Sequence, residues 1–178
     1  MAFVANKIQQ ISLNDSTFGM TKREQRILRK GWSEAFSEHI FPRINEGRFA
    51  VLYSDNPATR PNTPVNVIIG MFILKEIYNH TDDDLLEEIL FDIRYQNALH
   101  TTSFTEQPVS DRTLSRFRER LYAYELETGI DLMKEEMEAL ADAFVQMMKI
   151  SGQTKRMDSL MVASSCKKMS RLELVYRC

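Results

Sequence analysis

The residues best suited to chemistry lie between positions 110 and 122, where the sequence SDRTLSRFRERLY is typical of a basic amphipathic helix. With about 100° between successive residues, one face of this helix is apolar and carries Leu114, Phe117 and Leu121. The opposite face is polar and carries Arg112, Ser115, Arg116 and Glu119. Guanidinium groups are the best side chains for bridging phosphates or reading guanine edges. This helix is therefore the first candidate for an element that enters a DNA groove.

The same helix has a second interpretation that needs no ligand. Arginine and glutamate often share the solvated face of a helix, where they form ion pairs three or four residues apart. The pattern alone leaves both interpretations open. In the first interpretation, the DNA-binding residues are Arg112, Ser115, Arg116 and Arg120, together with Lys22, Arg23 and Arg26 from a basic segment near the N-terminus.

The charge of the chain is small overall but unevenly distributed. The net charge is −2 over 178 residues. Basic residues dominate positions 22–30 and the chain from 149 onward, whereas acidic residues dominate 82–92 and 125–142. A protein of this kind can bind nucleic acid through a local basic face while its acidic residues keep the remainder soluble. A patchwork surface with no nucleic-acid partner is the alternative.

The sequence disfavours several classes of protein. The longest apolar run, 65–74, is shorter than the roughly 20 residues that cross a bilayer, and the N-terminus lacks the order of a secretion signal. Cys166 and Cys178 make no disulfide framework, which fits a cytoplasmic protein with no membrane partner. An independent small enzyme has little support, because there is no glycine-rich phosphate loop and no recognisable pair of nucleophile and base. The histidines lack metal-ligand spacing and are expected to be surface residues or satisfied core residues: His39, His80 and His100.

Helices are predicted along most of the chain. Thr21 and Glu24 form a capping box that opens a basic helix, which Gly31 weakens before a further helical stretch. A proline-rich loop is expected over 53–64, followed by a helix over 65–78 that is apolar nearly all round and therefore buried. Further helices are expected over 81–91, over 94–99, from 110 with Ser110 as its cap, and over 129–150. The last of these has a core side made of Leu132, Met133, Met137, Leu140, Phe144 and Met147 or Met148.

The helices across 81–122 are compatible with a helix-turn-helix variant in which the last helix reads DNA. The loop over 100–108 is longer than the usual tight turn, and helical hairpins without any DNA role are common. The fold class predicted for the chain is mainly α, a helical bundle with a helix-turn-helix-like segment.

The pattern changes after Ser151 and Gly152. The following residues favour a strand that carries Asp158 and then the start of a helix, too few to bury a core of their own. We therefore expect a helical domain over 1–150 and the truncated start of a second domain over 151–178. A single aspartate on a strand is usually a turn or edge residue.

Three separated blocks of sequence together give the chain a family resemblance. They are the run from Arg60-Pro61 to Thr101, the block PVSDRTLSRFRERL, and the segment around Arg156-Met157-Asp158-Ser159. In order and spacing these blocks resemble the front part of bacterial insertion-sequence transposases of the DDE type, over roughly 45–178. The resemblance implies a helical N-terminal domain ahead of an RNase H-like catalytic domain. It also implies that Asp158 is the first carboxylate ligand of the catalytic metal ions, which are Mg²⁺ in the full-length enzyme.

Chemistry by a DDE site requires two further carboxylates that hold two metal ions. No residues follow that could supply them, so we expect an incomplete metal site at Asp158, no cofactor and no catalysis by this stretch alone. The expected function is recognition of the ends of an insertion sequence in double-stranded DNA during transposition. The alternative is a helical module that forms a homodimer or docks on the catalytic domain without reading DNA.

Overall fold

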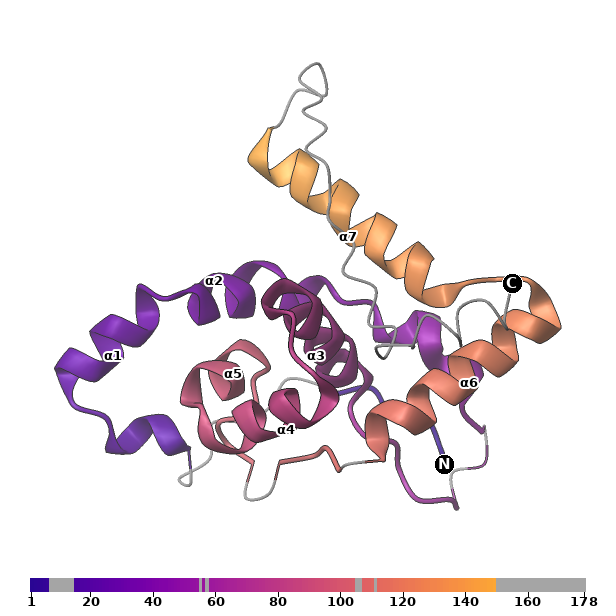
Figure 1. Ribbon diagram of the computed structural model, residues 1–178, viewed down its shortest axis with the longest axis horizontal. Coiled ribbons are helices and arrows are strands. Elements are labelled where there is room, and N and C mark those ends of the chain that lie inside the picture. Colours follow the sequence, from indigo (N-terminus) through magenta and orange to yellow (C-terminus); the bar gives the residue numbers. More distant parts are fainter. Residues whose placement is uncertain (7–14, 55, 57, 105–106, 111, 150–178) are drawn as a thin grey trace, which may run out of the picture.

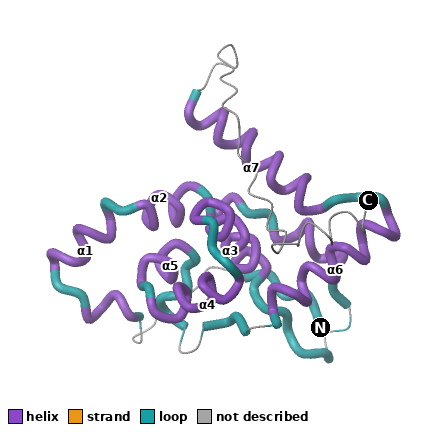
Figure 2. The backbone as a smooth tube through the Cα atoms, in the orientation of Figure 1, coloured by secondary structure: helices purple, strands orange, loops and turns teal. Residues whose placement is uncertain are grey.

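The computed structural model describes residues 1–6, 15–54, 56, 58–104, 107–110 and 112–149, and within them the chain is mainly helical (Figures 1 and 2). This confirms the mainly α class. The described residues contain no strand, only isolated bridges from Ala2 to Ser54 and to Pro61. The strand and helix expected over 151–178 lie outside the described residues. The elements in chain order are η1 (Ser16–Gly19), α1 (Lys22–Arg29), α2 (Trp32–His39), η2 (Phe41–Arg43), η3 (Glu46–Leu52), α3 (Val65–Tyr78), α4 (Asp82–Phe91), α5 (Ile93–Ala98), α6 (Thr113–Thr128) and α7 (Leu132–Met148).

Helix α3 is the centre of the core, as its apolar sequence predicts. Every residue from Val65 to Phe72 is buried, and the helix ends at Tyr78, just before Asn79, whose backbone is left-handed with φ 53°. Gly70 lies where another chain segment approaches closely, because a Cβ atom at this position would come within 2.6 Å of the Leu99 side chain. The expected bounds of this helix are confirmed.

Two helix starts follow from local capping chemistry. Thr21 and Glu24 form a reciprocal capping box at the start of α1, in which the Thr21 amide donates to Glu24 Oε2 at 2.7 Å. Thr81 and Asp84 form the same arrangement at the start of α4, with 2.9 Å from the Thr81 amide to Asp84 Oδ2. Both starts are confirmed, since each box satisfies amide groups that a helix N-terminus otherwise leaves without partners.

Helix α6 turns the predicted apolar face toward the core, but it begins later in the chain than predicted. Its first residue is Thr113 and its N-cap is Arg112, so the expectation that Ser110 caps the helix is wrong. Ser110 instead forms a turn in which its carbonyl accepts from the Thr113 amide at 2.8 Å. Leu114 and Phe117 are buried, and the Phe117 ring lies 5.8 Å from that of Phe49 and 6.1 Å from that of Phe72 between centroids.

The connection between α5 and α6 is a long loop, and α6 packs mainly on η3 and α7. Helices α4 and α5 contact each other directly. The helix-turn-helix-like arrangement of 81–122 therefore stays a prediction.

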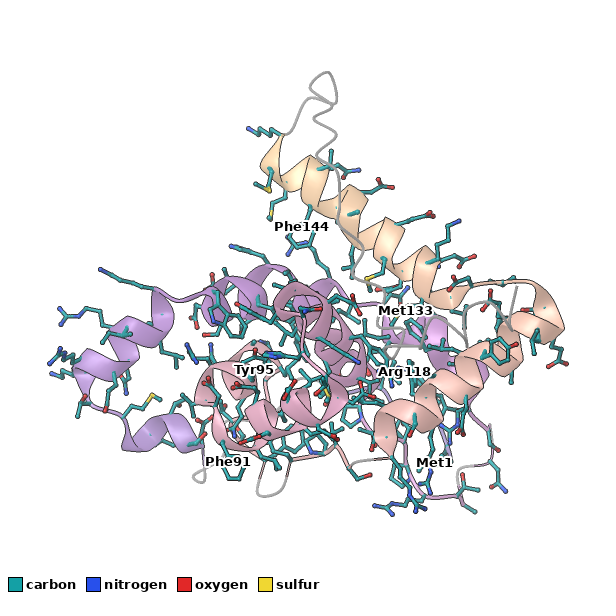
Figure 3. The ribbon with its side chains drawn as sticks, viewed as in Figure 1. Met1, Phe91, Tyr95, Arg118, Met133 and Phe144 are labelled. Carbon is teal, nitrogen blue, oxygen red and sulfur yellow. The ribbon has the colours of Figure 1, made fainter. Side chains whose placement is uncertain are left out.

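Helix α7 projects away from the other helices and is buried only along its first half (Figure 1). Leu132, Glu136 and Leu140 are buried, and Met133 and Phe144 lie on the side that faces the other helices (Figure 3). The expectation that Met147 or Met148 belongs to the core is wrong. These two side chains are 41% and 63% exposed, because a groove separates this end of the helix from α2 and α3.

Replacing Phe117 with alanine should destabilise the fold by roughly 3–5 kcal/mol, because the change removes a buried ring and leaves a cavity. Tyr122→Ala is the matched control, since Tyr122 lies on the same helix and is 63% exposed. Urea unfolding of both variants measures the difference. Equal stability of the two variants would contradict the rotation of α6 described above.

Candidate nucleic-acid interface

The arginines divide into two groups by their partners. Arg48, Arg94 and Arg118 form ion pairs with carboxylates. Among the described residues, no ion pair involves Arg112, Arg116, Arg120 or Arg60. Arg48 and Arg118 bind elements of the fold to one another, whereas Arg94 pairs with the N-cap of its own helix, Asp92. The second group carries charge that no carboxylate among the described residues pairs.

Arg118 and Asp82 join α6 to α4 through a bidentate ion pair. The two guanidinium nitrogens of Arg118 lie 2.5 and 2.7 Å from the two carboxylate oxygens of Asp82. Lys75 of α3 pairs with the same carboxylate, and the Arg118 guanidinium lies 4.9 Å from the centroid of the Phe72 ring. Hydrogen bonds from Arg118, aided by Lys75, hold the pKa of Asp82 well below its usual range.

A buried carboxylate joins α7 to η3. Glu136 is 1% exposed, and its oxygens accept from the Asn45 amide at 2.7 Å and from Arg48 Nε at 2.9 Å. A second nitrogen of Arg48 donates to Glu135 at 2.6 Å. Sequence analysis missed this contact, because Glu136 is a charged residue within an acidic segment and its partners lie far away in the chain. Such a buried charge is tolerated only when paired and hydrogen bonded.

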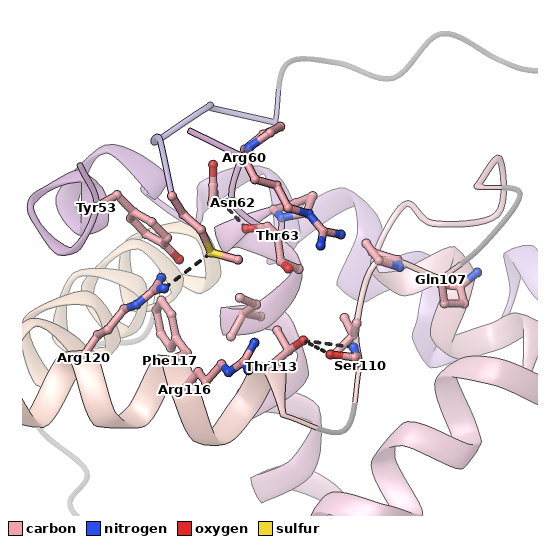
Figure 4. Close-up of a pocket in the computed structure, with 16 residues that line it drawn as sticks. Tyr53, Arg60, Asn62, Thr63, Gln107, Ser110, Thr113, Arg116, Phe117 and Arg120 are labelled. Atoms are coloured by element: carbon pink, nitrogen blue, oxygen red, sulfur yellow. Dashed lines mark hydrogen bonds between the residues drawn. The ribbon is translucent and has the colours of Figure 1, made fainter. Parts of the chain in front are cut away.

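A pocket of about 500 Å³ lies between the N-terminal half of α6 and the segment 60–64 (Figure 4). Arg60, Arg116 and Arg120 approach it from different sides. No aspartate or glutamate is found among the described residues that line it. Three guanidinium groups around one pocket, with no carboxylate among the lining residues that the structure describes, favour the binding of an anion.

Arg120 is held at the pocket edge by an aromatic ring. Its guanidinium lies 5.0 Å from the centroid of the Tyr53 ring, and one of its nitrogens donates to Met1 Sδ at 3.4 Å. Burial raises the pKa of the Tyr53 hydroxyl, and the positive charge of Arg120 opposes that shift. These contacts restrict the orientation of the guanidinium, and no carboxylate among the described residues pairs with its charge.

The N-terminus of α6 adds to the positive potential beside the pocket. Its first residue, Thr113, lines the pocket, and the N-cap Arg112 supplies no side-chain acceptor for the first amides of the helix. Helix N-termini carry a partial positive charge and exposed amide donors, and both favour an anion. This contribution has the same sign as that of the arginines.

The structure brings together only some of the predicted DNA-binding residues. Arg116 and Arg120 line the pocket, whereas Arg112 and Ser115 are exposed beside it, and the Ser115 hydroxyl donates to the Arg112 carbonyl at 3.3 Å. Lys22, Arg23 and Arg26 are exposed on α1, at the opposite end of the molecule from α6 (Figure 1). The two basic segments therefore do not form one continuous patch.

Arg60 lies in the stretch that the sequence predicts as a loop, and it is not among the predicted DNA-binding residues. The signal was present, since Arg60 precedes Pro61 at the start of the first block that carries the family resemblance. Asp158 lies outside the described residues, so its role as a catalytic residue and metal ligand stays a prediction, as does the use of Mg²⁺. Within the described residues, no three His, Cys, Asp or Glu side chains gather as a metal site would require.

The histidines have ordinary surroundings, as predicted. His80 Nε2 is 2.6 Å from the Tyr95 hydroxyl, His100 Nε2 is 2.6 Å from the Ser37 hydroxyl, and His39 is exposed. Burial lowers the pKa of His100. Among the described helices, none has the length and apolar character needed to cross a membrane.

Comparison with known proteins gives one family. The family described as "Transposase domain (DUF772)" matches residues 25–120, which is more than half of the chain. The match includes α3, the Asp82–Arg118 ion pair and the three pocket arginines. No curated protein and no solved structure gives a significant match.

Asp82 should make stability depend on pH in acid. Its folded pKa lies below the ordinary value of 3.8, so its ion pairs stabilise the fold fully above about pH 3.8 and progressively less below it. Asp82→Asn should therefore lower the free energy of unfolding at neutral pH, and the gap to the parent should narrow as the pH falls below 3.8.

The control is Asp83→Asn, because Asp83 is exposed in the same helical turn and forms no ion pair among the described residues. At neutral pH, Asp83→Asn should lower the free energy of unfolding by less than Asp82→Asn does. Urea unfolding over a pH series measures both variants, and a gap for Asp82→Asn that is the same at every pH would contradict the assignment.

Proposed function

The chain belongs to the family of DUF772 transposase domains, and on this premise we propose that it binds double-stranded DNA at the ends of an insertion sequence. The domain then supplies recognition during transposition. The observation that carries this proposal is the pocket at which Arg60, Arg116 and Arg120 meet without a carboxylate partner among the described residues.

The arrangement of charge supports DNA as the ligand. Guanidinium groups hold phosphates in a bidentate manner and can also reach the O6 and N7 atoms of guanine in the major groove. Arg112 and Arg116 stand at the exposed start of α6, next to the pocket. A DNA strand that passes over this start would meet Arg112, Arg116 and the helix N-terminus together.

Helix α1 is a second, separate candidate contact. It has no buried residue, and its basic side chains Lys22, Arg23 and Arg26 form no ion pair among the described residues. Because α1 lies at the far end from α6 (Figure 1), the two segments would contact different stretches of DNA. Substitutions in one segment can therefore be tested without disturbing the other.

One observation favours the alternative function, a helical module that forms a homodimer or docks on a protein partner. Val145, Met147 and Met148 are exposed at the end of α7, and the two methionines line an apolar groove of about 270 Å³ between that end, α2 and α3. A second apolar groove, of about 440 Å³, lies between α3, α6 and the start of α7. Contacts made by such apolar surface depend little on salt, whereas phosphate contacts weaken steeply with salt. Salt dependence therefore separates the two functions.

Replacing both Arg116 and Arg120 with alanine should weaken binding to a duplex that carries the element ends. The expected loss is about 1–3 kcal/mol for each arginine that reads a base. An arginine that contacts phosphate should lower the salt slope by about one unit when it is removed. Fluorescence anisotropy at several salt concentrations measures both quantities.

Two further variants make this experiment specific. Lys134→Ala removes an exposed positive charge from α7 and should leave affinity unchanged. Arg23→Ala with Arg26→Ala tests α1 in the same assay. Full affinity in the α6 variant together with a loss in the α1 variant would move the DNA contact away from the pocket.

A further inference from the structure

We infer that the pocket between α6 and segment 60–64 receives a single unpaired nucleotide of a DNA strand. This inference rests on the proposed function and specifies the ligand of the same site. It depends on the size of the pocket, on the two kinds of lining, on the position of Arg120 and on the hydrogen bonds that hold the backbone of 60–64.

The size of the pocket exceeds what a phosphate needs. Its volume of about 500 Å³ falls in the range of roughly 300–1,000 Å³ that is usual for small-molecule sites. A phosphate contact on the outside of a duplex needs only exposed cationic side chains and no concave pocket. The hollow between α6 and 60–64 is large enough for a phosphate together with its sugar and base.

The lining is positive at the rim, and between the arginines it combines polar groups of Asn62, Thr63, Gln107, Ser110 and Thr113 with an apolar part. Arg60, Arg116 and Arg120 supply the charge. The apolar part consists of Pro61, Pro64, Ile68, Pro108, Val109 and Phe117. A nucleotide likewise has a charged part and an apolar part, since its phosphate is an anion and its base and sugar present apolar faces. Inorganic phosphate would use only the charged part.

Arg120 is oriented to stack on a base. The Tyr53 ring lies on its guanidinium at 5.0 Å from the ring centroid, and the Tyr53 ring itself lies 5.9 Å from that of Phe3. Planar guanidinium groups stack on nucleobases as well as on aromatic rings. A base that enters the pocket can stack on this guanidinium.

Segment 60–64 holds its residues in place before any ligand arrives. The Ala2 amide donates to the Arg60 carbonyl at 3.1 Å, and the Asn62 amide donates to the Ala2 carbonyl at 3.1 Å. The Asn62 side chain accepts from the Val4 amide at 2.6 Å and donates to the Thr63 carbonyl at 2.8 Å. Fixed walls reduce the ordering cost of binding, which favours a small ligand in a defined pose.

The nucleotide must be unpaired, because a base inside a duplex is stacked on both sides and cannot enter a concave pocket. Proteins that bind a base in a pocket act on single strands or displace the base from the stack. Aromatic and arginine platforms beside a positive groove are the usual means of holding single-stranded DNA. The pocket combines both features at one place.

The test compares a blunt duplex with the same duplex carrying a single-stranded extension at either end, by fluorescence anisotropy at fixed salt. The parent protein should bind an extended duplex roughly 5- to 100-fold more tightly, which is the usual effect of stacking one base. Arg120→Lys keeps the charge but loses the planar group, so the ratio of its affinities for the extended and the blunt duplex should fall close to one, whatever its affinity for the blunt duplex. Lys134→Ala should bind both duplexes like the parent, and thermal unfolding confirms that each variant is folded.

Three outcomes overturn the inference, and they are distinguishable. Equal affinity of the parent for the blunt and extended duplexes overturns the nucleotide pocket but leaves the proposed function standing. A preference that survives in folded Arg120→Lys places the unpaired nucleotide elsewhere on the protein. Failure of the parent to bind either duplex at low salt overturns the proposed function as well.

Discussion

The rotation of α6 about its own axis is the constraint on which the rest of the structure depends. Phe117 enters the core beside Phe49 and Phe72, and the next residue, Arg118, binds Asp82 through two hydrogen bonds. Because successive residues differ by about 100° around a helix, these two contacts leave only one rotation possible. In that rotation, Arg116 and Arg120 meet at the pocket on the N-terminal half of the helix.

The two groups of arginines show how one side-chain type serves both folding and binding. Arg118 and Arg48 each join two elements through a carboxylate that is itself held by further hydrogen bonds. An exposed single ion pair contributes little to stability, but bidentate pairs with additional partners contribute more. Arg116 and Arg120 lack such carboxylates among the described residues, so their charge stays available outside the fold. A chain of net charge −2 can therefore keep a strongly positive site.

Patterns local to the chain could be predicted, and contacts between distant segments could not. The apolar run of α3, the capping boxes of α1 and α4 and the buried stripe of α6 each depend on residues within a few positions of one another. Arg60 reaches the pocket only because 60–64 packs beside α6, and Glu136 is buried only because η3 covers it. No periodicity in the sequence encodes either contact. The uncovered end of α7 was missed for the same reason, since an apolar stripe does not show whether another element lies over it.

The central claim, that α6 and segment 60–64 form the DNA contact, can be tested most directly by arginine-specific chemical footprinting. The protein would be modified with phenylglyoxal in the presence and absence of element-end duplex and analysed by mass spectrometry. We expect DNA to protect Arg60, Arg116 and Arg120, while the modification of Arg43, which is exposed on η2, stays the same. Protection confined to Arg23 and Arg26 of α1, with unchanged modification at the pocket, would contradict the claim.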